Sequence, residues 1–305
     1  MVEMHTEPVR VPMRAPFAAD ALFGFLATRA VAGVEAGDGS VYRRTLRLPH
    51  GPGALEARWR RDGHALDCRV YAADPRDLAD ALGAPHRIFD TAADPARIDA
   101  RLGRDPVLAP LVERAPGTRS PGQADGFEMA VRAVLGQQVS VASARTVAAG
   151  LTARYGTPLG APVMGLTHLF PSPDALAAAD PADLPMPAGR KRALLGLARA
   201  VADGEIDLGP DADVEEAAAR MLALPGIGPW TVGYVRMRAF GDGDAFLPTD
   251  IGVRNALRRL GRSGDPKSAE ELARNWTPFR SYALHHLWAA AARPGPAAAT
   301  EEESP

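Results

Sequence analysis

Apolar and polar residues alternate along the first quarter of the chain as they do in half-buried β-strands. Segments with this alternation follow one another at short intervals: Val41–Leu48, Ala54–Trp59 and Ala65–Tyr71. A period of two places one face of each strand in a core and the other in solvent. The Asp62-Gly63 pair before the last segment is typical of a tight hairpin turn. The pattern predicts an antiparallel sheet, with a further strand at Val9–Met13.

Helical spacing of apolar residues accompanies these strands and then replaces them. Asp20–Ala30 has this spacing, with Asp20 suited to cap the helix, and Asp77–Leu82 follows a proline. Beyond about residue 90 only helical spacing remains, around a Gly/Pro-rich connection at 156–173. The helices predicted there are Phe127–Leu135, Val139–Tyr155, Pro173–Ala179, Lys191–Asp203, Val214–Leu222, Pro229–Phe240, Ile251–Leu260, Ser268–Asn275 and Trp276–Ala292.

Together the two patterns predict an α+β protein. We expect an N-terminal antiparallel β-sheet domain with helices over residues 1–90, followed by an all-α core over residues 91–293. Residues 294–305 are rich in proline, alanine and glutamate, and we expect them to form a disordered tail.

Composition narrows the classes of protein that remain. No apolar run reaches the roughly 20 residues that span a bilayer, and the N-terminus lacks a signal-peptide pattern. We therefore expect a cytoplasmic protein with no membrane partner. A single cysteine, Cys68, excludes an internal disulfide and a cysteine-ligated iron–sulfur cluster. A net charge of −2 gives no sign of a broadly basic surface for nucleic acid.

Residues 224–229, Leu-Pro-Gly-Ile-Gly-Pro, join two predicted helices. Pro225 ends the first helix, and Pro229 suits the first turn of the second. Gly226 and Gly228 permit a tight turn and the close approach of another backbone. The start of the second helix presents unpaired N–H groups and a positive dipole end, which bind phosphate without lysine or arginine. The alternative is a plain Gly/Pro turn between two packed helices.

Two aromatic side chains and a carboxylate follow this hairpin. Trp230 and Tyr234 lie one turn apart on one helix face, and Asp250 is placed to cap the helix that starts at Ile251. A carboxylate at a helix N-terminus is favoured in its ionised form. It can then stabilise an oxocarbenium-like sugar or orient a water that attacks C1′. The alternatives are a purely structural cap and ordinary aromatic core packing.

These residues resemble the helix-hairpin-helix DNA glycosylase superfamily, and most closely its alkylation-repair branch, the 3-methyladenine DNA glycosylase II enzymes. The resemblance covers about residues 10–292 and includes the N-terminal sheet unit. Its motifs are L-P-G-I-G-P-W-T at 224–231, F-L-P-T-D at 246–250, and the segments 116–122, 127–141 and 280–288. It implies a helix-hairpin-helix glycosylase core whose two helical subdomains flank the active-site cleft.

The resemblance implies a role for each matching residue in the cleft. Asp250 matches the catalytic aspartate, and Trp230, Tyr234 and Trp288 match aromatic walls of the pocket for the flipped base. Lyase-competent members carry a lysine two residues after the second hairpin glycine, where this chain has Trp230. A Schiff-base route through that position is therefore absent.

The resemblance assigns DNA contacts to the hairpin and to one loop. The hairpin contacts are Leu224, Gly226, Ile227, Gly228 and Thr231. Main-chain carbonyls of Leu224 and Ile227 match a site for a structural monovalent or divalent cation, and no other cofactor is expected.

A loop residue is expected to wedge into the duplex. Gln138 stands where the branch has a leucine wedge, so either this glutamine serves or Gln137 or Val139 takes part.

The implied activity is that of a monofunctional DNA glycosylase. It would flip alkylated purines, such as 3-methyladenine and 7-methylguanine, out of double-stranded DNA and hydrolyse their N-glycosidic bond for base excision repair. DNA containing alkylated bases is the expected partner, and a monomer is the expected state. Two alternatives are a glycosylase for other damaged or mismatched bases and a non-catalytic helix-hairpin-helix DNA-binding protein.

Overall fold

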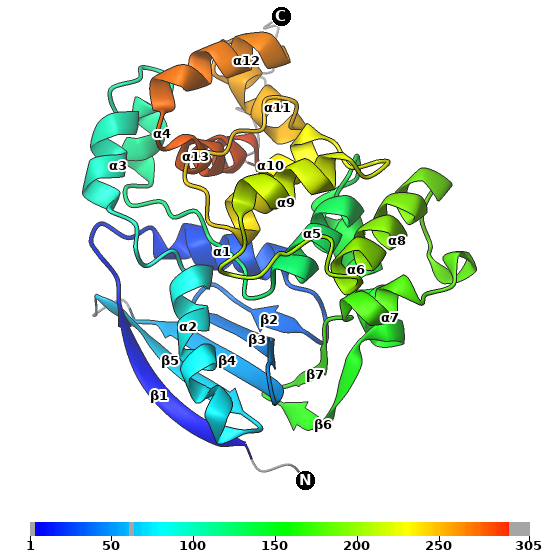
Figure 1. Cartoon of the computed structure of the whole chain (residues 1–305). Helices are drawn as coiled ribbons and strands as arrows, with labels where there is room; N and C mark the ends of the chain where they lie inside the picture. Colours follow the sequence, from blue (N-terminus) through cyan, green and yellow to red (C-terminus); the bar gives the residue numbers. More distant parts are fainter. Residues whose placement is uncertain (1–3, 61–63, 293–305) are drawn as a thin grey trace, which may run out of the picture.

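A computed structural model describes residues 4–60 and 64–292, and it confirms the predicted fold class. An antiparallel sheet lies beneath a larger helical part (Figure 1). The strand order in the sheet is β1-β5-β4-β3-β2. The strands are β1 (His5–Pro12), β2 (Glu35–Gly37), β3 (Val41–Leu48), β4 (Gly51–Trp59) and β5 (Ala65–Ala72).

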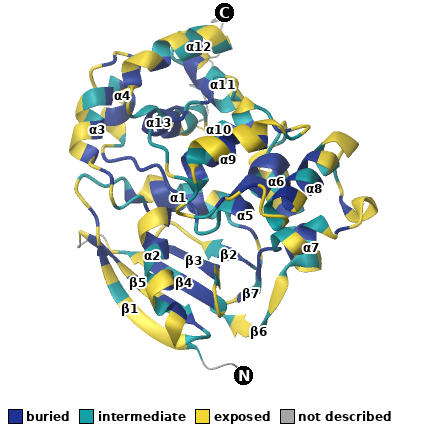
Figure 2. Cartoon of the chain, viewed as in Figure 1, coloured by how far each residue is buried: buried dark blue, intermediate teal, exposed yellow. Residues whose placement is uncertain are grey.

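The inner face of the sheet is buried by two helices, α1 (Ala19–Arg29) and α2 (Leu78–Ile88). Alternate strand residues, among them Leu46, Leu55 and Val70, pack there with apolar side chains of both helices. Helix α1 lies between the sheet and the helical part (Figure 1). The buried residues gather on this face and inside the helical part (Figure 2).

The helical part packs as two clusters of apolar side chains. Helices α5, α6, α8 and α9 build one, and α3, α4, α11, α12 and α13 build the other. Helix α10 belongs to both clusters and so lies between the two subdomains. These helices are α3 (Pro95–Leu102), α4 (Ala109–Arg114), α5 (Gly126–Leu135), α6 (Val141–Tyr155), α7 (Pro173–Ala177), α8 (Ala188–Ala202), α9 (Val214–Leu222), α10 (Pro229–Ala239), α11 (Ile251–Arg259), α12 (Pro266–Ala273) and α13 (Arg280–Ala292).

The structure corrects several predicted element limits. Asp20 lies inside the first turn of α1, whose cap position is Ala18. The connection at 156–173 contains a hairpin of β6 (Thr157–Val163) and β7 (Leu166–Leu169), whose first strand is mostly exposed and lacks alternation. The predicted helix Trp276–Ala292 starts only at Arg280, because Pro278 lacks an N–H and restricts the residue before it.

The structure adds three short elements that the sequence pattern does not predict. Strand β2 and helices α3 and α4 are each eight residues or shorter, too short for a clear period. The domain limits at residues 90 and 293 stay predictions, and the predicted tail at 294–305 lies outside the described residues. Within the described ranges, no helix is long and apolar enough to cross a membrane.

A buried ionic network joins the sheet to helix α5. Arg44 of β3 donates from Nη2 to Glu128 Oε2 at 2.7 Å, and Arg132 Nη1 donates to Glu35 Oε2 at 2.8 Å. Tyr42 donates its hydroxyl to the other oxygen of Glu35. Since α5 also lines the cavity described below, the network fixes one wall of that cavity against the sheet.

The segment 116–122 passes closely between the sheet unit and the helical core. A Cβ on Gly117, which has φ +74°, would lie 2.1 Å from the carbonyl oxygen of Pro16. A Cβ on Gly122 would lie 2.5 Å from the carbonyl oxygen of Arg87. Glycine is therefore required at both positions, and the backbone between them supports α10, because Arg238 donates to the carbonyl of Pro121.

Candidate active site

The hairpin between α9 and α10 rests on helix α8. Gly226 has φ +88°, and a Cβ there would lie 3.0 Å from the Cβ of Ala193. Helix α10 then starts at Pro229, with Gly228 at the cap position and no side chain capping its N–H groups. Most other helices of the described chain have an Asp or Ser cap, as α11 and α12 do. The first N–H groups of α10 therefore remain available to an anion.

The two hairpin glycines should respond differently to alanine. Gly226→Ala is expected to lower the free energy of unfolding by about 1–2 kcal/mol, because an L-residue is strained at its positive φ. Gly228→Ala should change it by less than about 0.5 kcal/mol, since its φ is −112° and no atom lies within 4 Å of the added Cβ. Urea unfolding of both variants tests this difference, and equal losses would contradict it.

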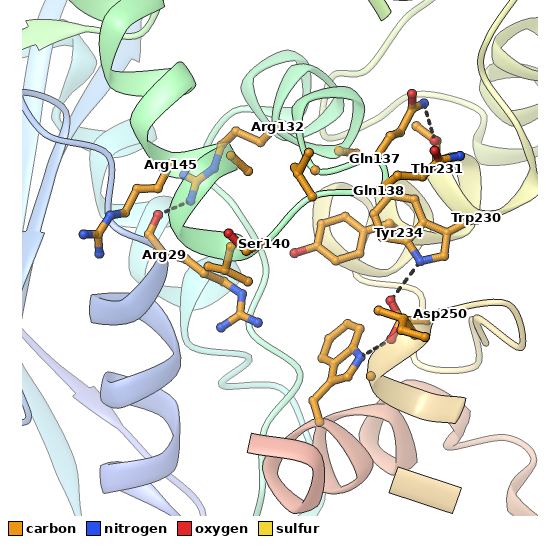
Figure 3. A pocket seen from close by; sticks show the side chains of 18 of the residues that line it. Arg29, Arg132, Gln137, Gln138, Ser140, Arg145, Trp230, Thr231, Tyr234 and Asp250 are labelled. Atoms are coloured by element: carbon orange, nitrogen blue, oxygen red, sulfur yellow. Dashed lines mark hydrogen bonds between the residues drawn. The ribbon is translucent and has the colours of Figure 1, made fainter. Parts of the chain in front are cut away.

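Asp250 caps α11 and is oriented by both indoles of the cleft. Its Oδ1 accepts from the backbone N–H of Val253 at 3.0 Å and from Trp288 Nε1 at 2.9 Å. Its Oδ2 accepts from Trp230 Nε1 at 3.0 Å (Figure 3). The predicted cap is thus present, and two neutral N–H donors besides it orient the carboxylate, which lines the cavity described next.

The three predicted aromatic residues come together around one cavity of about 1100 Å³. The rings of Trp230 and Tyr234 stack with centroids 5.4 Å apart and planes 19° apart. The ring of Trp288 lies 6.1 Å from that of Tyr234. Asp250 lines the same cavity, so a planar ring that stacks on one of these aromatic faces would lie near its carboxylate. This arrangement suits a flipped base, which gains from stacking on aromatic faces.

Gly252 allows the approach of one indole, a role that the sequence analysis missed. A Cβ there would lie 3.0 Å from both Trp288 Cδ1 and Asp250 Oδ1. A side chain would therefore push the indole away from the carboxylate. The only local signal is a glycine in the first turn of a helix, which by itself is ambiguous.

Helix α1 of the sheet unit contributes side chains to the cavity region that the sequence analysis also missed. Phe25 stacks on Trp288 with centroids 6.3 Å apart, and the guanidinium of Arg29 lies 3.7 Å from the ring centre of Phe25. Arg29 itself lines the cavity (Figure 3). No local pattern could indicate this, because α1 is about 200 residues from the hairpin in sequence.

Positive charge surrounds the far end of Tyr234. Burial raises the pKa of its hydroxyl, but the charges of Arg238, Arg29 and Arg132 outweigh burial and lower the pKa below its usual value. Arg238 Nη1 donates to the hydroxyl oxygen at 3.3 Å. Burial and the same two arginines, Arg238 and Arg29, hold the pKa of His285 well below its usual range. This histidine is thus neutral where it contacts Trp288 edge-on.

The loop between α5 and α6 lies beside the hairpin and Trp230 at the rim of the cavity. Gln138 is exposed there, with φ +56°. Gln137 instead donates both amide hydrogens within the protein, from Nε2 to the carbonyl of Gly226 and to Thr231 Oγ1, each at 3.0 Å. Both glutamines are predicted from the sequence to contact DNA, but their side chains have different surroundings.

The remaining hairpin residues point largely into the protein. The side chains of Ile227 and Thr231 are buried, and Leu224 packs partly against the core of the first subdomain. Any contact of Ile227 or Thr231 with DNA must therefore be made through the backbone. The structure thus places the hairpin, the aromatic walls, Asp250 and the two glutamines around one cavity, with Gln137 next to Thr231 (Figure 3).

Comparison with known proteins matches both parts of the chain. Residues 8–125 match the family described as the AlkA N-terminal domain, and residues 131–280 match the HhH-GPD superfamily of base excision DNA repair proteins. A 3-methyladenine DNA glycosylase from Archaeoglobus fulgidus superposes with a TM-score of 0.79 over 93% of this chain and 98% of that one. At 21% identity, this likeness shows a shared fold.

Curated relatives are closer in sequence. The chain is 43% identical to the probable bifunctional transcriptional activator/DNA repair enzyme AlkA of Mycobacterium tuberculosis over 93% of its own length, although it spans only 57% of that relative. It is 37% identical to DNA-3-methyladenine glycosylase 2 of Escherichia coli, over 88% of this chain and 92% of the relative. With this identity over nearly all of both chains, and with both domains matched in order, the chain belongs to the DNA-3-methyladenine glycosylase 2 family of helix-hairpin-helix base excision DNA repair proteins.

Proposed function

We propose that this chain is a monofunctional DNA glycosylase that hydrolyses the N-glycosidic bond of alkylated purines, such as 3-methyladenine and 7-methylguanine, in duplex DNA. The observation that carries the proposal is Asp250, whose two oxygens are oriented by Trp230 and Trp288 at the mouth of an aromatic cavity. The hairpin that precedes it offers uncapped N–H groups to a phosphate.

In the proposed reaction, the flipped base enters between the aromatic walls and its sugar stays near Asp250. Bond cleavage leaves positive charge on the sugar, and the carboxylate stabilises that charge and the approach of water. Alkylation at N3 or N7 makes the purine cationic and weakens its glycosidic bond. A cation against an aromatic face gains about 0.5–2 kcal/mol. A roomy cavity of stacked aromatics therefore suits several alkylated purines.

The cavity contains no amine for a lyase reaction among the residues that line it. Trp230 occupies the position of the lyase lysine and donates to Asp250. The chain has two lysines, Lys191 and Lys267, and neither lines the cavity. Water is therefore the proposed nucleophile, and an abasic site is the proposed product.

The activity is tested on DNA treated with a methylating agent. The purified chain is expected to release free 3-methyladenine and 7-methylguanine, detected by chromatography, and to leave abasic sites. The strand should be nicked only after added heat or base. Borohydride should trap no covalent protein–DNA adduct, since a Schiff base needs an amine. Trapping of an adduct would contradict the monofunctional mechanism, and intact methylated bases would contradict the activity itself.

Two accompanying proposals concern the bound state. We propose that the chain acts as a monomer on double-stranded DNA. The carbonyls of Leu224 and Ile227 are proposed to hold a structural monovalent or divalent cation. The Leu224 oxygen accepts one hydrogen bond, from the Ile227 N–H at 3.1 Å, and so retains a lone pair for such an ion. No other cofactor is proposed.

A further inference from the structure

Gln137 connects the loop at the cavity rim to the hairpin and to helix α10 by hydrogen bonds. Its side-chain amide donates to the carbonyl of Gly226 in the hairpin and to Thr231 Oγ1 in the first turn of α10. Its own carbonyl accepts from Arg190 Nη2, at the start of α8, at 2.5 Å. One residue of the loop is thus fixed to three other segments of the fold.

The residue that follows is held in an uncommon conformation. Gln138 has φ +56°, a region that L-residues other than asparagine, aspartate and glycine rarely occupy. Such a conformation persists where the surrounding structure imposes it. On the other side, Gly136 lies on the edge of Trp230, with an added Cβ 3.7 Å from that ring. The bonds of Gln137 therefore set where the exposed side chain of Gln138 points.

The two hydrogen bonds of the Gln137 amide join it to the hairpin and to the residue next to Trp230. Gly226 belongs to the hairpin whose N–H groups are proposed to bind a phosphate, and Thr231 follows Trp230, which donates to Asp250. A shift of the hairpin on binding phosphate would thus pass directly to the rim loop. Both hydrogen bonds of the Gln137 amide are made within the protein, so the connection is already formed in the absence of DNA.

We propose that Gln137 is a positioning residue. It couples binding of the DNA backbone by the hairpin to insertion of Gln138, in the loop between α5 and α6, into the duplex. The proposal rests on the proposed function, because it concerns the base-flipping step of that reaction. Gln137 acts through Gly226, Thr231 and Gln138 and needs no contact with the DNA itself.

The test separates flipping from binding and from chemistry. A duplex carries one 7-methylguanine beside 2-aminopurine, whose fluorescence rises when its neighbour leaves the stack. The Asp250→Asn background keeps the base attached. In this background Gln137→Met should lower the equilibrium constant for base flipping about tenfold, because two hydrogen bonds are lost. Binding of undamaged duplex should change less than about threefold, because the hairpin N–H groups remain.

A double-mutant cycle with Thr231→Val provides the matched control. This isosteric change removes one acceptor of the Gln137 amide, so it should lower flipping by a smaller factor alone and by nothing further beside Gln137→Met. Arg190→Met, which frees the Gln137 carbonyl instead, should act in the same direction.

Three results would overturn the coupling role. They are an unchanged flipping equilibrium, an equal loss of flipping and of undamaged-duplex binding, and fully additive effects of the Gln137 and Thr231 changes. Base release by the wild-type chain is measured in parallel. Failure of the wild type refutes the proposed function, whereas an active wild type with an indistinguishable Gln137→Met variant refutes only the coupling.

Discussion

Asp250→Asn is expected to lower the single-turnover rate of base release about a hundredfold to a thousandfold, the usual effect of removing a pre-oriented group that stabilises transition-state charge. The amide keeps one acceptor oxygen, which can still serve Val253 and Trp288. Its NH₂ group then faces the Trp230 N–H, donor against donor. Binding of the alkylated duplex should persist, because the proposed phosphate contacts come from the backbone N–H groups of the hairpin and not from Asp250.

The matched control for this variant is Asp265→Asn. Asp265 caps α12 as Asp250 caps α11, by accepting from the backbone N–H of Ser268 at 3.0 Å, but it does not line the cavity. Its asparagine variant should release alkylated bases at the wild-type rate within about twofold. Release of 7-methylguanine under enzyme excess measures both. Full activity of Asp250→Asn would show that the carboxylate charge is not used.

Arg44→Met is expected to lower the free energy of unfolding by about 3–5 kcal/mol. Arg44 is 1% exposed and donates at 2.7 Å to Glu128, also 1% exposed, so methionine leaves a buried carboxylate without its main partner. Burial lowers the pKa of Arg44, but Glu128 and its neighbours outweigh burial and raise it, in keeping with a strongly stabilised charge.

Arg43→Met is the control on the same strand. Arg43 pairs with Glu56 at 2.6 Å, but its side chain is 35% exposed, and such surface pairs contribute less than about 1 kcal/mol. Urea unfolding at pH 7 compares the two variants. A loss for Arg44→Met no larger than for Arg43→Met would contradict the importance of the buried network.

Some elements of the fold can be predicted from the local pattern of apolar and polar residues, and others cannot. Local pattern predicts α9, α10 and α11 closely, because all three are bounded by Pro, Gly or Asp. Helices α9 and α11 each bury one face, whereas α10 packs against both subdomains. Alternation in the sequence also predicts β3 and β5, although burial alternates along β5 and not along β3, which is buried on both faces over most of its length. Elements that bury little surface or are only a few residues long, such as β2 and the β6–β7 hairpin, leave no such pattern and appear only in the folded chain.

By itself the sequence determined the α+β class, the hairpin with its uncapped helix start, and the candidate set of Asp250, Trp230, Tyr234 and Trp288, because local chemistry and a specific motif mark each of them. Only the tertiary structure decided that both indoles donate to Asp250, and that α1 adds Phe25 and Arg29 from the distant sheet unit.

The two adjacent glutamines show why the sequence alone does not decide which side chain is exposed at the cavity. From the sequence, Gln138 is the first candidate for the wedge and Gln137 an alternative, and both are predicted to contact DNA. In the fold, Gln137 turns inward to bond the hairpin and α10, while Gln138, with its positive φ, is exposed at the rim of the cavity. Which side chain faces the partner depends on contacts between segments about 90 residues apart, and no local pattern of polar and apolar residues carries that information.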